Sequence, residues 1–242
     1  MQNSNEDKAL ENFILASLPP SEYAWLRPKL REVELPQGKI LCRARDPVPA
    51  VYFPISCLLS WTNSTEMGEV VEVGITGNEG LTGMILLLDE NLSPWQVEVQ
   101  LPGRAFELSV NDFIAALDRS PTLRQRVTAF AYLKLLQINQ SALCNRFHSI
   151  EERLCRWLLA AQDYSQTSEF SLTRGILAEM IGAGRPSVSL ATGTLQTAGL
   201  IHAKRGHITI LDREGMEDTA CECYQIVREA YDRYRAKKIR LD

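Results

Sequence analysis

The sequence of 242 residues lacks most of the features that mark a metal, haem or membrane protein. No uninterrupted apolar run approaches the roughly 20 residues that a membrane-spanning helix needs. The N-terminal MQNSNEDKAL is polar and has no apolar signal core, so we expect a cytoplasmic protein. No histidine precedes His148, which leaves a haem or metal site in residues 1–147 without histidine ligands. The six cysteines are scattered rather than spaced as a disulfide framework, and we expect neither a metal nor a cofactor.

Positive charge is missing from one long stretch of the chain. Residues 46–103 contain eight acidic residues and no lysine or arginine. A phosphate buried among them would have no cationic partner, and burying an unpaired charge is strongly unfavourable. This stretch is therefore a poor site for a phosphorylated ligand.

The formal net charge of −4 argues mildly against a nucleic-acid partner, but the charge is unevenly distributed. Residues 1–145 carry 12 basic and 17 acidic side chains, whereas residues 146–242 carry 14 and 13. Between residues 171 and 207 the only acid is Glu179, and the basic residues before His207 are Arg174, Arg185, Lys204 and Arg205. A DNA-binding protein needs a local positive face and tolerates an acidic remainder.

Residues 35–109 have the texture of a small β domain. Gly, Pro and Asn punctuate short runs rich in Val, Ile and aromatic residues, at 50–53, 70–73, 96–100 and 105–108. Alternation with turn signals at this spacing is typical of a small antiparallel barrel or sandwich.

A long helix is expected to follow. Ser120 is a suitable N-cap, Pro121 suits the first helical position, and no Gly or further Pro occurs up to about Asn145. Its apolar residues form two stripes, one with Leu123, Val127, Phe130, Leu133 and Leu136, the other with Leu135, Ile138 and Ala142. A surface helix needs only one stripe, so we expect the second to pack on a partner in a homodimer. The alternative is a central core helix in a monomer.

Residues 149–184 predict two further helices and a sharp turn. Ser149 and Glu152 form a capping box for the first of these helices. Thr173 is a plausible N-cap for a short helix over 174–181. Gly182 and Gly184 after it permit the positive φ of a sharp helix–helix turn.

The next helix is expected to start at Arg185-Pro186 and to end at Gly199. Its apolar side, which can pack on the preceding helix, holds Val188, Ala191, Leu195 and Ala198. Its other side is small and polar apart from a basic first residue, and holds Arg185, Ser187, Ser189 and Thr192. Two alternating runs then flank Arg205-Gly206 and predict a hairpin with a basic tip.

This pattern resembles the winged helix-turn-helix of the Crp/Fnr superfamily, the cyclic-AMP receptor type of bacterial regulators. The matching residues are Thr173, Leu177-Ala178, Ile181-Gly182, Arg185-x-Ser187-Val188-Ser189, Leu195-x-x-Ala198-Gly199-Leu200-Ile201 and Ile208-x-Ile210-x-Asp212. A subgroup is closer still, through Tyr52-Phe53-Pro54, Glu151-x-Arg153-Leu154, Trp157-Leu158-Leu159 and Ala220-Cys221-Glu222-Cys223-Tyr224.

The resemblance implies an α+β fold over nearly the whole chain. A β-barrel or jelly-roll sensor domain of the cyclic-nucleotide-binding type would occupy residues 1–120, followed by a dimerisation helix over 121–145. A hinge over 146–148 would lead to a winged helix-turn-helix DNA-binding domain over 149–242.

The resemblance also implies which residues contact DNA. Arg185 matches the arginine that reads a guanine, and a guanidinium can bond both O6 and N7 of that base. Positions that contact phosphate are matched by Thr173, Ser187 and Ser189, and the neighbouring or wing candidates are Arg174, Lys204, Arg205 and His207. Two departures stand out: an acid and a second base-reading arginine of the superfamily are replaced by Pro186 and Leu190.

The sensor domain departs from the superfamily at its ligand site. The acid that grips the ribose is replaced by Met84, and the arginine on the phosphate falls on Ser93 or Pro94. We therefore expect no tight binding of cyclic AMP, and the effector stays unknown. No cysteine quartet near the N-terminus supports an iron–sulfur cluster of the superfamily type.

Two cysteines and one histidine in the C-terminal half are residue types that can bind a metal ion. Two helical residues at i and i+2 point about 200° apart, so we expect Cys221 and Cys223 to pack rather than chelate. His148 is expected to cap a helix or to lie on the surface.

The sequence thus favours a homodimeric DNA-binding transcription regulator with no catalytic residues. Its partners would be double-stranded DNA, a second copy of the chain and, for an activator, RNA polymerase. The alternatives are an enzyme with a site in the β-barrel, for which no nucleophile–base spacing stands out, and a ligand-sensing scaffold that does not bind DNA.

Overall fold

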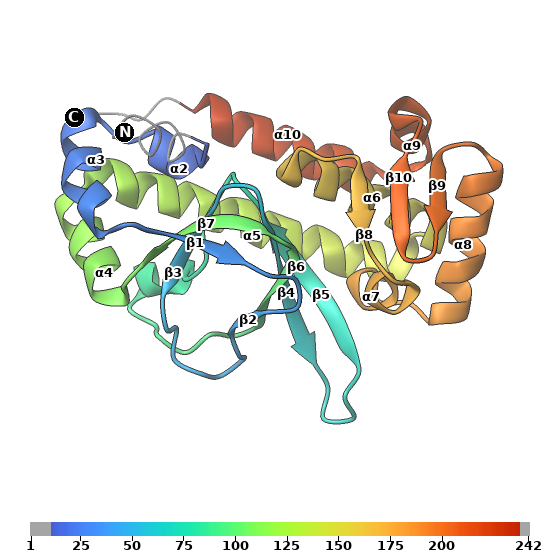
Figure 1. Ribbon diagram of the computed structural model, residues 1–242, viewed down its shortest axis with the longest axis horizontal. Helices are drawn as coiled ribbons and strands as arrows, with labels where there is room; N and C mark the ends of the chain where they lie inside the picture. Colours follow the sequence, from blue (N-terminus) through green and yellow to red (C-terminus); the bar gives the residue numbers. More distant parts are fainter. Residues whose placement is uncertain (1–10, 238–242) are drawn as a thin grey trace.

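The computed structural model describes residues 11–237 and has the expected α+β architecture (Figure 1). The short helices α2 (Phe13–Ala16) and α3 (Pro20–Leu26) and the 3-10 turn η1 (Arg27–Lys29) precede a β domain. Long helices and a small second sheet follow. None of the described helices combines the length and the apolar character needed to cross a membrane.

The β domain is built from two antiparallel sheets, with strand orders β1-β7-β3 and β2-β6-β4-β5. The strands are β1 (Arg31–Leu35), β2 (Ile40–Cys42), β3 (Val51–Pro54), β4 (Leu58–Ser64), β5 (Val70–Thr76), β6 (Gln96–Leu101) and β7 (Gly103–Leu108), and the 3-10 turn η2 (Met84–Leu88) separates β5 from β6. The first five residues of β4 are all buried, because helices cover its outer face while its inner face lines the barrel.

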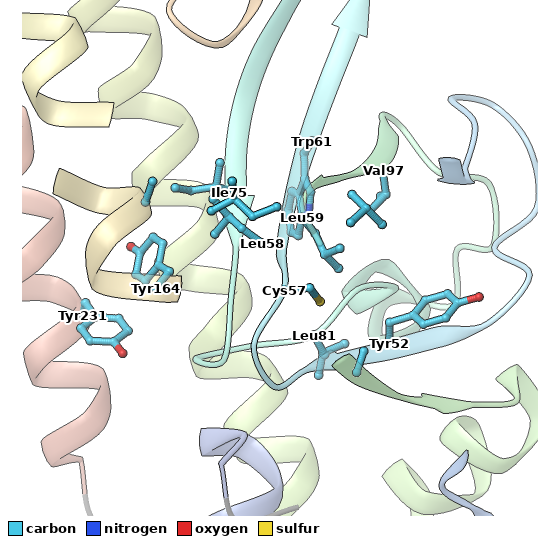
Figure 2. Packing of buried hydrophobic residues seen from close by; sticks show 14 of the residues in the cluster. Tyr52, Cys57, Leu58, Leu59, Trp61, Ile75, Leu81, Val97, Tyr164 and Tyr231 are labelled. Atoms are coloured by element: carbon cyan, nitrogen blue, oxygen red, sulfur yellow. The ribbon is translucent and has the colours of Figure 1, made fainter. Parts of the chain in front are cut away.

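Figure 2 shows the packing on the two faces of this sheet. Leu58 and Ile75 lie between their strands and Tyr164 of α6 (Ile150–Ser165), with Tyr231 of α10 (Glu222–Ala236) behind it. Val97 lies on the opposite, inner face of the sheet. The barrel therefore has one core of its own and a second one shared with the helices.

Helix α4 (Val110–Arg119) leads into the long helix α5 (Pro121–Phe147). The expected N-cap is present, since Ser120 Oγ accepts a hydrogen bond from the Leu123 N–H at 2.9 Å. The helix runs past residue 145, so the first two residues of the hinge expected at 146–148 are helical. The break between α5 and α6 consists of His148 and the N-cap Ser149, whose capping box with Glu152 is formed.

The C-terminal region contains α6, α7 (Arg174–Met180), α8 (Arg185–Thr197) and α9 (Arg213–Thr219). The hairpin expected from the sequence is β9 (Ile201–Lys204) paired with β10 (His207–Ile210). A third strand, β8 (Glu169–Ser171), pairs with β10 and was not expected from the sequence. Residues 163–169 look like a polar connector, but Phe170 on this short strand is buried and anchors it.

Helix α10 turns away from the winged region and packs along α5 (Figure 1). The Tyr234 hydroxyl donates to the Glu79 carbonyl at 3.1 Å, and the Tyr234 ring contacts Phe13 edge-on at 5.0 Å. Its backbone carbonyl accepts a hydrogen bond from Arg126 Nη1 at 3.4 Å. Helix α10 thus joins the two regions, because it packs along α5 while Tyr224 and Arg228 contact Asp163 of α6 and Glu217 of α9. The sequence places this helix in a DNA-binding domain over 149–242.

A buried ion pair joins α5 to the barrel. Lys134 Nζ lies 2.8 Å from Glu79 Oε1, and both side chains are fully buried. The ammonium also donates to the Ile75 carbonyl and lies over the ring of Phe130 at 4.9 Å. Removing one partner of such a pair would leave an uncompensated buried charge, which typically costs about 3–5 kcal/mol.

Candidate nucleic-acid interface and sensor pocket

The α7–turn–α8 unit is shaped by a helix cap and by one glycine with positive φ. Thr173 Oγ1 accepts a hydrogen bond from the Ile176 N–H at 3.2 Å and starts α7. Gly182 has φ +58°, which favours glycine, and this turns the chain out of α7. Gly184 does not share this role, contrary to the expectation, because it is the extended N-cap of α8 with φ −72°.

Helix α8 packs on the domain through its apolar side. Val188, Ala191 and Leu195 are buried as expected, but Ala198 is exposed. Thr192, expected on the polar side, is also buried, with its hydroxyl donating to the Val188 carbonyl at 2.7 Å. Because the hydroxyl forms its hydrogen bond with the backbone of its own helix, this threonine can be buried in the core.

The outer side of α8 carries the residues expected to contact DNA. Arg185 is the first residue of the helix, Ser187 lies in the same turn and Ser189 in the next, and both serines are exposed. The Ser189 hydroxyl donates to the Arg185 carbonyl at 3.0 Å. Leu190, where the superfamily has a second arginine, is 72% exposed and adds an apolar side chain to this face.

The wing presents two cations at its tip. Lys204 and Arg205 are exposed, and the turn is closed by positive φ at Arg205 (49°) and Gly206 (83°). His207 begins β10, and its Nδ1 lies 3.3 Å from the Ser171 hydroxyl on β8. Arg174 in α7 is half-buried, and this burial lowers the pKa of its guanidinium. The expected residues therefore share one region, formed by α7, the outer side of α8 and the wing.

A groove separates the start of α8 from the barrel. It has a volume of about 720 Å³ and lies between the β4–β5 hairpin (residues 63–71) and the α7–α8 turn, with Arg185 in its wall. The Arg185 guanidinium rests against α7, where a Cβ on Gly175 would lie 3.2 Å from Nε. A Cβ on Gly182 would lie 3.1 Å from Val71 Cγ2, so the hairpin and the turn are close neighbours. In this conformation the base-reading candidate faces the sensor domain.

Hydrogen bonds to Glu72 on β5 join helix α6 to the barrel. Trp157 Nε1 donates to Glu72 Oε1 at 2.7 Å, and the Ser60 hydroxyl donates to Oε2 at 2.7 Å. Burial raises the pKa of Glu72 to about 8, although these two donors oppose the shift. Burial, reinforced by the charge of Glu179 on α7, also raises the pKa of Glu98 on β6. Sequence reasoning missed these acids because nothing in the pattern places them at a domain boundary.

The barrel interior near η2 holds a cavity of only about 10 Å³. Its walls are formed by Leu41, Cys42, Val48, Ala50, Tyr52, Thr82, Gly83, Met84, Ile85, Ser93, Trp95 and Val97, with no cation among them. A single water molecule needs about 10–15 Å³ of such volume. The cavity therefore has room for about one water.

The two positions that differ from the superfamily lie in this cavity wall. Met84 is half-buried, and Ser93 is buried with its hydroxyl donating to the Trp95 carbonyl at 2.6 Å. Arg45 lies just outside the cation-free stretch, and its N–H donates to the Ser93 carbonyl at 2.7 Å. Its side chain is exposed, so Arg45 contacts the cavity wall through its backbone.

Two family models match the chain. The Crp-like helix-turn-helix domain matches residues 152–219, and the cyclic nucleotide-binding domain matches residues 32–120. Together they cover the winged region and most of the barrel. The helix-turn-helix match ends before α10, in keeping with the packing of that helix on α5.

Three solved bacterial proteins illustrate the structures with the same fold. A putative transcriptional regulator of the Crp/Fnr family from Eubacterium rectale is 14% identical with a TM-score of 0.66, over 85% of this chain and 96% of that one. FixK2 from Bradyrhizobium japonicum is 14% identical with a TM-score of 0.67, over 79% and 98%. The c-di-GMP responsive global regulator CLP from Xanthomonas campestris is 17% identical with a TM-score of 0.60, over 80% and 100%. Curated protein sequences contain no significant match.

Proposed function

We propose that the chain is a DNA-binding transcription regulator of the Crp/Fnr type and that it binds one specific DNA sequence as a homodimer. The observation that carries this proposal is the outer face of α8, which is exposed, begins with Arg185 and, apart from Leu190, carries small polar side chains. A guanidinium at the start of a recognition helix can reach a guanine edge, while the serines behind it are short enough to let the helix approach. The barrel enzyme considered from the sequence is thereby set aside.

The remaining cations are suited to the DNA backbone. Lys204 and Arg205 lie at the wing tip, with Thr173, Arg174 and His207 at the base of the same surface. Phosphate contacts of this kind position a protein on DNA without reading its sequence. Arg185 is accordingly the single charged base reader in our proposal.

An exposed apolar stripe of α5 supports the homodimer, and of the second stripe expected from the sequence it includes only Leu135. Apolar side chains along it are largely exposed in the single chain: Tyr132 (67%), Leu135 (65%), Leu143 (41%) and Phe147 (73%). They fall within about a third of the helix circumference at 100° per residue, which is the width of a helix–helix seam. A parallel pair of α5 helices would cover this stripe and place two α8 helices on successive major grooves about 34 Å apart.

The sensor domain is proposed not to bind cyclic AMP. A nucleotide is far larger than the cavity of about 10 Å³, and the cavity wall offers its phosphate no cation. One relative with this fold is described as responsive to c-di-GMP, so the family is not restricted to cyclic AMP. We propose no ligand for this chain, and contact with RNA polymerase is proposed only if it is an activator.

Selection of bound fragments from sheared bacterial DNA, followed by sequencing, tests the function. We expect enrichment of an inverted repeat with half-sites about one helical turn apart and a G·C pair in each half. Retention of random fragments with no shared motif would overturn sequence-specific binding.

A further inference from the structure

Four side chains that commonly bind metals meet where α5, α6 and α10 join. Cys144 lies in the last turn of α5, His148 follows that helix, and Cys221 and Cys223 open α10. Their ligand atoms all lie within 4.8 Å of one another. Cys144 Sγ is 3.5 Å from Cys221 Sγ, and Cys223 Sγ is 3.6 Å from His148 Nδ1. These four residues are called the hinge cluster below.

The expectation that Cys221 and Cys223 cannot bind the same metal ion assumes that both residues are helical. This assumption is wrong. Cys221 is the N-cap of α10, with extended φ −70° and ψ 161°. Its side chain therefore does not follow the helical rotation, and both thiols turn towards Cys144. His148 likewise does more than cap a helix, since its ring enters the cluster.

The spacing fits one tetrahedral ion. Zinc binds thiolate sulfur at about 2.3 Å and imidazole nitrogen at about 2.0–2.1 Å, which places neighbouring ligand atoms about 3.5–3.8 Å apart in a tetrahedron. The two closest pairs in the cluster are already at this separation. Three sulfurs and one imidazole nitrogen are also the donor set that zinc prefers in closed structural sites.

A contact with a carboxylate orients the His148 ring. His148 Nε2 lies 3.2 Å from Glu222 Oε2, which leaves Nδ1 to face the sulfurs. Histidine ligands of metals usually donate their other N–H to such a carboxylate, which fixes the tautomer. The positive charge of the Arg156 guanidinium acts on Cys144, so a cation is present to offset the excess negative charge of three thiolates around one divalent ion.

We propose that the hinge cluster binds one Zn²⁺ ion per chain in a closed tetrahedral site. Only His148 and Ser149 separate α5 from α6, so the ion ties the break between the dimerisation helix and the DNA-binding domain to the start of α10. Loading would thus fix the direction in which α6, and with it α7 and α8, leaves α5. The site itself does not depend on DNA binding.

Cobalt titration of the reduced full chain tests the site, with Co²⁺ as the spectroscopic probe and Zn²⁺ as the competitor. We expect one Co²⁺ per chain, with thiolate-to-cobalt charge transfer and the visible bands of a tetrahedral ion, both abolished by one equivalent of Zn²⁺. Cys223→Ser should weaken binding at least about tenfold, since it removes one ligand. Cys42→Ser is the control, because this half-exposed cysteine lies on β2, away from the cluster.

Glu222→Gln provides a milder variant, because the carboxylate is 66% exposed and its loss should not disturb folding. We expect it to weaken metal binding by about 10- to 100-fold while the protein keeps its melting profile without metal. Absence of a tetrahedral cobalt spectrum, or an unchanged spectrum in Cys223→Ser, would overturn the proposal. So would a reduced protein that takes up no zinc but, when oxidised, loses two hydrogen masses through a Cys144–Cys221 disulfide.

Discussion

Trp157 donates its indole N–H to Glu72 across 2.7 Å, and this bond joins helix α6 to strand β5 of the barrel. The carboxyl group is buried and lies near Lys134 and Arg156, but it forms no ion pair with either in the described structure. Its protonated form is therefore favoured, and the contact between the two domains is coupled to pH. Arg185 lies in the wall of the groove between this barrel and the α7–α8 turn.

Stability should fall as the pH rises from about 5 to about 8. The pKa of Glu72 is raised from 4.5 to about 8 in the folded chain, so the folded state holds a proton that the unfolded state has released. The contribution of Glu72 to stability is complete below the pKa of the unfolded state and is lost as the pH rises through the pKa of the folded state. The free energy of unfolding falls by at most about 1.4 kcal/mol per pH unit.

Thermal melts of the wild type and Glu72→Gln between pH 5 and pH 9 measure this effect. Glutamine mimics the neutral acid and can still accept from Trp157, so the variant should show a flatter profile and a higher melting temperature than the wild type above pH 8. Glu107→Gln is the control, because Glu107 is a half-buried partner of the exposed Arg31 on the other sheet. Parallel profiles for wild type and Glu72→Gln would contradict the neutral buried acid.

The homodimer should come apart when charge is placed on the exposed stripe of α5. Tyr132→Glu with Leu135→Glu puts two charges into the seam without touching the buried face. Light scattering at micromolar concentration should give twice the monomer mass for the wild type and the monomer mass for the variant. Loss of bivalent binding should then reduce affinity for a two-half-site DNA by about 10²- to 10⁴-fold.

Leu211→Glu is the matched control for that experiment, since this residue is 61% exposed but follows the wing. It should leave the mass unchanged. A wild-type chain that stays monomeric with and without DNA would refute the role of the stripe.

Cyclic AMP and cyclic GMP should not bind with useful affinity. The cavity at η2 would have to expand from about 10 Å³ and would still offer the phosphate no cation in its wall. Calorimetry with either nucleotide should give no saturable heat at sub-millimolar concentration. A dissociation constant in the micromolar range would mean that the barrel opens and that Arg45 or backbone N–H groups replace the missing arginine.

The sequence predicted those parts of the fold that local signals determine. Caps at Ser120, Ser149 and Thr173 and the Arg205-Gly206 turn involve neighbours within a few residues, and each is present. The site residues from Thr173 to His207 lie in one region for the same reason.

Features set by distant contacts could not be predicted. Helix α10 has an amphipathic pattern, but nothing in it specifies α5 as the surface that it covers. The hinge cluster brings together Cys144 and Cys221, which are 77 residues apart in the sequence, and it requires the extended backbone of the N-cap Cys221. Glu72 looks like any strand acid until α6 is placed over it. The helical periodicity alone places Thr192 on the polar side of α8. It does not take into account that the hydroxyl can donate a hydrogen bond to the backbone of the same helix.

The central claim is that α8 reads bases while the wing contacts phosphates. Arg185→Ala, Lys204→Ala and the control Lys39→Ala on the exposed edge of the barrel can be compared on the selected site and on scrambled DNA at several salt concentrations. Arg185→Ala should cost about 1–3 kcal/mol on the selected site and little on scrambled DNA, with selectivity relaxed at one base pair per half-site. Lys204→Ala should weaken both DNAs and lower the salt slope by about one per lost contact in each subunit, whereas Lys39→Ala should change neither. Equal weakening of both DNAs by Arg185→Ala would show that α8 does not read bases, and would contradict the account.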